Sequence, residues 1–92
     1  MCKIEKELIV VNKKGMHARP AALFVGLVEK FNVTVTLAKG DEVVNGQSIM
    51  GILMLGAAEG TVLKVTVEGP QALEAMAKFK KFFSKQEEEL VS

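Results

Sequence analysis

The sequence predicts an α+β fold in which three helices cover one face of a four-stranded antiparallel sheet, an open-faced β-sandwich. Apolar residues alternate with a period of two in some segments and recur every three or four residues in others, in the order β-α-β-β-α-β-α. A chain of 92 residues suits one domain, which we expect over residues 1–92. The composition, 49% apolar and 25% charged, is typical of a globular protein.

The first strand is expected over residues 8–11, a β-branched run, and a polar loop ending at Gly15 follows it. Beyond the loop, apolar side chains at spacings of three and four predict one buried face of an amphipathic helix that ends near Asn32. These side chains are Leu23, Phe24, Leu27, Val28 and Phe31.

The second strand is predicted over residues 33–38, where apolar and polar side chains alternate. A turn at residues 40–41 should join it in a hairpin to a short third strand, Glu42–Asn45. Ser48 is expected to cap a short helix over Ile49–Leu55, because its hydroxyl can accept from amides of the first turn.

The fourth strand is predicted over residues 63–68 by the clearest alternation in the chain, and Gly69 and Pro70 end it and open the last helix. The apolar face predicted for that helix comprises Leu73, Met76, Phe79 and Phe83. Residues 86–92 carry three consecutive glutamates and no packing pattern, so we expect a frayed, solvated tail.

Composition excludes several classes of protein. The formal net charge of +1 lacks the basic excess of nucleic-acid-binding domains, and Cys2 is the only cysteine, so no disulfide is expected within the chain. The N-terminal residues contain no signal-peptide core, and the longest apolar stretch, residues 20–28, is shorter than the ~20 residues that span a bilayer. We therefore expect a monomeric cytoplasmic protein that neither binds nucleic acid nor inserts into a membrane.

The candidate functional residue is His17, which follows the glycine loop and precedes a helix with Pro20 in its first turn. Backbone amides and the positive end of the helix dipole form an anion site at such a terminus, and they should keep the imidazole neutral and nucleophilic. Arg19 can hold two phosphoryl oxygens, so Ala18 and Arg19 are predicted to bind phosphate. No metal-ligand set or second catalytic group is evident, which predicts a carrier without a cofactor rather than an enzyme.

The run from Gly15 to Pro20, Gly-Met-His-Ala-Arg-Pro, resembles the active-site signature of the HPr family, the histidine-containing phosphocarriers of the sugar phosphotransferase system. Residues 46–56 are similar to the regulatory-serine region of that family. The resemblance implies that enzyme I, phosphorylated by phosphoenolpyruvate, phosphorylates His17 on Nδ1. His17 would pass the group to sugar-specific enzyme IIA domains with the help of Arg19.

The same resemblance implies two roles for the short helix. Ile49, Met50 and Leu53 would form a docking patch for donor and acceptor proteins, and Ser48 would be phosphorylated for regulation by an HPr kinase/phosphorylase. Gln47 stands where many relatives have lysine, so the affinity for partners can differ from theirs.

Alternatives remain open at this point. The phosphotransfer chemistry could serve a nitrogen-related or regulatory branch without sugar uptake. A small RNA-binding domain shares the β-α-β-β-α-β order, although the five phenylalanines fall in the helical patterns and not on the strands where bases would stack. A hydrolase of acyl or phosphate esters would need a positioned water and a second catalytic group.

Overall fold

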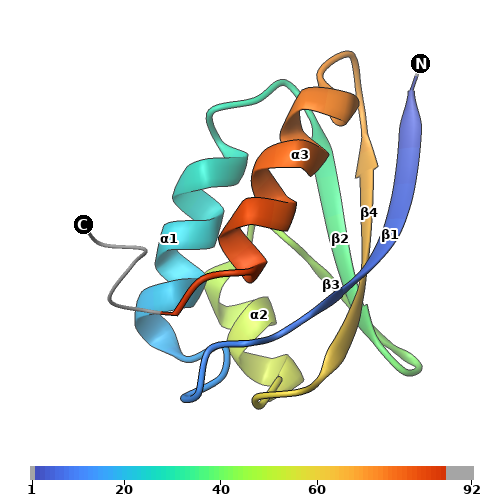
Figure 1. Ribbon diagram of the computed structural model, residues 1–92. Coiled ribbons are helices and arrows are strands. Elements are labelled where there is room, and N and C mark those ends of the chain that lie inside the picture. The colour runs from blue at the N-terminus through green and yellow to red at the C-terminus, as the bar shows by residue number, and fades with distance from the viewer. Residues whose placement is uncertain (1, 87–92) are drawn as a thin grey trace.

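The computed structural model describes residues 2–86 and has the predicted element order (Figure 1). The α+β class and the order β-α-β-β-α-β-α are therefore confirmed. The elements are β1 Lys3–Ile9, α1 Ala18–Val28, β2 Thr34–Lys39, β3 Glu42–Asn45, α2 Ile49–Leu55, β4 Val62–Glu68 and α3 Ala72–Phe83.

All neighbouring strands of the sheet are antiparallel, in the order β1-β4-β2-β3. The predicted hairpin between β2 and β3 is present, with Lys39 opposite Glu42. β4 lies in the interior of the sheet and pairs with β1 from Val62 to Glu68 and with β2 from Lys64 to Glu68. The first and last strands along the chain are therefore neighbours, which brings the segment before α1 next to the one before β4.

The three helices lie on one side of the sheet, as Figure 1 shows. β4 alternates as predicted, because Leu63, Val65 and Val67 are fully buried while Lys64 and Glu68 are exposed. One face of the sheet thus packs on helices and the other meets solvent.

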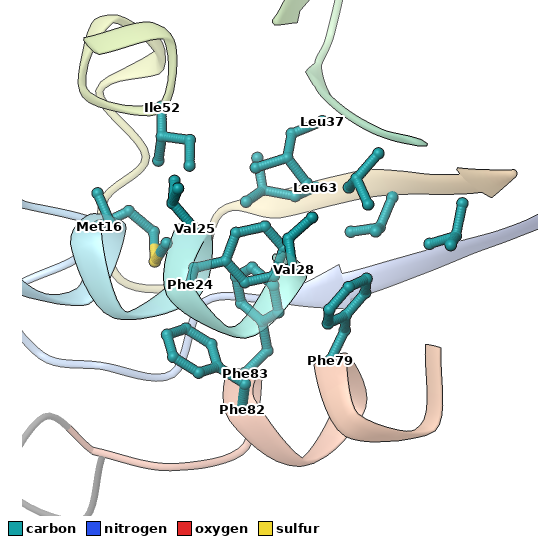
Figure 2. Close-up of a cluster of buried hydrophobic side chains, with 14 of the residues drawn as sticks. Met16, Phe24, Val25, Val28, Leu37, Ile52, Leu63, Phe79, Phe82 and Phe83 are labelled. Carbon is teal, nitrogen blue, oxygen red and sulfur yellow. The ribbon is translucent and has the colours of Figure 1, made fainter. Parts of the chain in front are cut away.

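The core between the layers is built around Phe24 of α1. Its ring centroid lies 5.0 Å from that of Phe79 and 5.4 Å from those of Phe82 and Phe83, at tilted angles that aromatic pairs favour. Figure 2 shows these rings between α1 and α3, with Met16 at the end of the cluster nearest the loop before α1. The aromatic side chains therefore fix α1 and α3 to each other.

Several predicted boundaries are wrong. β1 spans Lys3–Ile9 rather than residues 8–11, because it is an edge strand with no fully buried side chain to mark its start. β2 and β4 differ from their predicted bounds by one residue. α1 ends at Val28, short of Asn32, and Glu29 is its C-cap. Phe31, predicted on the helix, lies beyond it and is half-buried against Phe79.

The buried face of α3 differs from the predicted one at its start. Leu73 is 74% exposed, whereas Ala72 and Ala75 are fully buried. The face that meets the sheet runs through Ala72, Ala75, Met76, Phe79, Phe82 and Phe83, and Leu73 lies one residue outside it. The small side chains of Ala72 and Ala75 fit where α3 packs on the sheet. A large apolar side chain, such as that of Leu73, was therefore a poor guide to which positions of the helix are buried.

The segment after α3 is ordered further than predicted. Gln86, assigned to the frayed tail, makes two hydrogen bonds to the segment that follows β1. The rest of the expected tail, residues 87–92, lies outside the described residues. Across residues 2–86, none of the helices combines the length and the hydropathy that a bilayer crossing requires.

Candidate functional site

His17 lies at the start of α1, as the sequence predicted. It is the N-cap residue, with extended backbone angles (φ −88°, ψ −168°), and its carbonyl accepts from Ala21 N–H at 3.0 Å to begin the helix. Among the described atoms its side chain makes no capping hydrogen bond. Pro20 has no N–H, and the N–H of Ala21 bonds the carbonyl of His17. The backbone donors that this helix end presents are therefore the amides of Ala18 and Arg19.

The environment of His17 is asymmetric. The ring is half-buried, with Nε2 shielded from solvent, whereas Ala18 and Arg19 are exposed. Lys13 and Lys14 in the preceding loop are exposed too. The helix N-terminus therefore lies among cations at the surface, where an anion can reach it.

The loop that delivers His17 is organised by Asn12, a buried polar side chain. Its Nδ2 donates to the carbonyl of Gly15 at 3.3 Å, and its Oδ1 accepts from Lys14 N–H at 3.4 Å. Gly15 N–H in turn donates to the carbonyl of Asn12 at 2.9 Å. Asparagine followed by a polar run and glycine is a known turn pattern, so the sequence carries a signal for this role of Asn12 as well as for the predicted loop.

Gly15 and Met16 fix the loop against the segment after α2. Met16 N–H donates to the carbonyl of Ala57 at 2.8 Å, and the Met16 side chain is buried in the core. Gly15 has φ +71°, and a Cβ there would lie 2.6 Å from the Ala57 oxygen and 2.9 Å from Ala58 Cα. Only glycine allows this conformation and this close approach.

The predicted docking residue Leu53 is brought next to His17. Both line an open hollow between the loop and the end of α2, together with Lys14, Met16, Gly56, Ala57 and Ala58. Leu53 is half-buried against the core. The loop and α2 therefore form one continuous surface.

The remaining docking candidates, Ile49 and Met50, are 42% and 66% exposed on α2. Met54, outside the predicted docking patch, is 72% exposed on the same helix. The inward side of α2 is held by Ile52 and Leu55, which are buried. A short helix with three exposed apolar side chains presents a surface suited to protein contact.

Ser48 is the N-cap of α2, as predicted. Its Oγ accepts from Gly51 N–H at 3.0 Å, and its side chain is half-buried. At the other end, Gly56 adopts the left-handed conformation (φ +59°), and Lys39 Nζ donates to the carbonyls of Leu55 and Gly56 at 3.1 and 3.5 Å. The contribution of Lys39 had no sequence signal, because it comes from a distant strand.

Gln47 is exposed in the turn before α2, and its N–H donates to Asn45 Oδ1 at 2.8 Å. Within residues 2–86, no cluster of three histidine, cysteine, aspartate or glutamate side chains could hold a metal ion. The assembled site thus consists of one histidine at a helix start, one arginine and an apolar helix beside them.

Comparison with known proteins places this site in context. Residues 4–85 match a family described as PTS HPr component phosphorylation site. Phosphocarrier protein HPr of Xylella fastidiosa (strain 9a5c) is 41% identical over 80 residues, which cover 87% of this chain and 90% of the relative.

Solved structures agree in fold. A crystal structure of phosphocarrier protein HPr from Bacillus anthracis str. Ames superposes with a TM-score of 0.85 at 35% identity, covering 90% of this chain and 99% of that one. HPr-C-His from Thermoanaerobacter tengcongensis gives a TM-score of 0.84 at 40% identity, with coverage of 88% and 91%.

Proposed function

Because the chain belongs to the PTS HPr family, a family of phosphocarrier proteins, we propose that His17 is the residue on which it carries the phosphoryl group. The observation that carries the proposal is the position of His17 at the N-cap of α1. The nitrogen-related or regulatory branch is not favoured, since the relatives bear the name of HPr itself.

The reaction begins when Nδ1 attacks the phosphorus held by phosphorylated enzyme I. A nitrogen–phosphorus bond forms at His17, the bond to enzyme I breaks, and its electron pair returns to enzyme I. The burial of Nε2 favours Nδ1 as the nitrogen that meets the donor. In transfer to an enzyme IIA domain, a nucleophile of that domain attacks the phosphorus on His17. The nitrogen–phosphorus bond breaks, and its electron pair returns to Nδ1.

Ala18 and Arg19 stabilise the transferred group. Their backbone amides at the start of α1 can donate to phosphoryl oxygens, and the helix dipole favours the negative charge there. Arg19 is an exposed residue, and its guanidinium can donate two hydrogen bonds to an anion in a planar fork, which an ammonium group cannot do.

Partners dock on the surface that surrounds His17. Ile49 and Met50, exposed on α2, and Leu53, in the hollow beside His17, supply apolar contact area for enzyme I and enzyme IIA domains. Met54 extends this patch. Phosphorylation of Ser48 by an HPr kinase/phosphorylase would place about two negative charges at the edge of the patch. The protein acts as a single-domain monomer in this scheme.

The test of the function is phosphoryl transfer in vitro. Wild-type protein and a His17→Ala variant are incubated with enzyme I and labelled phosphoenolpyruvate, and the label is examined for the acid lability and base stability of phosphohistidine. We expect stoichiometric labelling of the wild type and none of the variant, because His17 is the only histidine. Labelling of a folded His17→Ala variant would refute the assignment.

A further inference from the structure

Gln86 joins the end of the described chain to the segment that leads to His17. Its side-chain Nε2 donates to the carbonyl of Val11 at 2.8 Å, and its Oε1 accepts from the N–H of Lys13 at 3.1 Å. In Figure 1 the red segment that follows α3 runs towards the blue start of α1. Two residues about 75 positions apart in the chain thus share hydrogen bonds.

The two groups that Gln86 binds are those that a neighbouring strand would bind. In a parallel sheet, the N–H and the C=O of one residue of the adjacent strand can bond the carbonyl of one residue and the N–H of the residue two further on. Val10 still has such a neighbour, since it exchanges hydrogen bonds with Thr61 and Gly60. At Val11 and Lys13 the amide of Gln86 takes this place.

The bound segment leads directly into the His17 loop. Asn12, between the two bound residues, holds Gly15 and Lys14, and Met16 is fixed to Ala57. The Gln86 contacts therefore complete a series of backbone ties from the end of β1 to the residue before His17.

We propose that Gln86 is a positioning residue for His17. By holding the backbone of Val11 and Lys13, it fixes the direction in which the loop enters α1 and so the geometry of the nucleophile relative to a docked donor. The proposal rests on phosphoryl transfer at His17. Because an error of about 1 Å in the position of a reacting group can cost up to 10²-fold in rate, loss of this tie should slow transfer itself.

The test uses Gln86→Met, which keeps the length and bulk of the side chain and removes both hydrogen bonds. Gln71→Met is the matched control. Gln71 lies at the opposite end of α3, and its Oε1 accepts from the backbone N–H of Asn32 at 2.6 Å. Each variant thus removes hydrogen bonds between a glutamine side chain and the backbone, and only those of Gln86 adjoin the His17 loop.

Two readouts are needed on the full chain. Amide hydrogen exchange should become roughly tenfold faster at Lys13 in Gln86→Met and at Asn32 in Gln71→Met. In transfer from phosphorylated enzyme I, Gln86→Met should lower kcat roughly three- to tenfold with KM within about twofold, because docking is untouched. Gln71→Met should transfer at the wild-type rate.

The outcomes separate this inference from the proposed function. Unchanged exchange at Lys13 would show that Gln86 does not hold the loop, and faster exchange with an unchanged kcat would show that the tie does not position His17. Either result overturns the inference. Absence of transfer to wild-type protein would instead refute the proposed function, while the exchange data would still decide whether Gln86 holds the loop.

Discussion

Single residues of the site are constrained by conformation and by space. Gly15 is the clearest case, since its positive φ and the nearby backbone of Ala57 and Ala58 both exclude a side chain. Asn12 is constrained in another way, because its buried amide supplies hydrogen bonds that the loop backbone would otherwise lack. These two residues build the loop, and His17 is the residue that the loop presents.

A Gly15→Ala substitution should therefore be strongly destabilising. We expect a loss of about 2 kcal/mol or more in the free energy of unfolding, from left-handed strain and the clash with Ala57. Gly26→Ala is the control: it lies within α1, and apart from its chain neighbours and the adjoining helix backbone no described atom lies within 4 Å of the added Cβ. It should stabilise by about 0.5–1 kcal/mol. Urea denaturation measures both, and similar effects of the two variants would contradict the geometry.

Among the elements, α2 combines a structural role with the recognition role proposed for it in seven residues. So short a helix is not stable alone. It is held by Ser48 at its start, by Gly56 and Lys39 at its end, and by Ile52 and Leu55 in the core. Its other side carries the docking patch that we propose, which makes the charge at Ser48 important.

A Ser48→Asp variant should fold normally and transfer poorly. Aspartate caps helices as well as serine does, but its charge would lie beside the proposed docking patch and would oppose an acidic partner. We expect roughly tenfold lower kcat/KM for transfer from enzyme I, while the neutral cap Ser48→Asn should stay near wild type. Equal transfer by the two variants would argue against regulation through charge at this position.

At the scale of the whole molecule, one aromatic cluster connects the layers. Phe24 of α1 contacts three rings of α3, and α3 packs on β1 and β4. The start of α1 and the residues after α3 are consequently held in a fixed relation, which allows Gln86 to reach the His17 loop. The packing of the aromatic cluster therefore affects the geometry of the loop before His17.

Truncation of this cluster should weaken the entire fold. Phe24→Ala is expected to cost about 3–5 kcal/mol in the free energy of unfolding, as for other buried phenylalanines. The control Leu73→Ala, at an exposed position of α3, should change it by no more than about 0.5 kcal/mol. Chemical denaturation followed by circular dichroism measures both, and a large effect at Leu73 would contradict its exposed placement.

The sequence by itself determined the features that depend on local interactions. The element order, the bounds of α2, the Ser48 cap and the place of His17 before a helix all follow from periodicity, capping chemistry and turn residues within short windows. The motif around His17 also carried the family resemblance, which the comparisons confirmed.

Only the tertiary structure decided the features that join distant segments. The extent of β1 depends on its pairing with β4, the exposure of Leu73 on how α3 meets the sheet, and the end of α2 on Lys39 from β2. The contact of Gln86 with the His17 loop likewise needed the folded chain. Such contacts leave no periodic signal, because each is formed by one side chain and a backbone group that packing brings within reach.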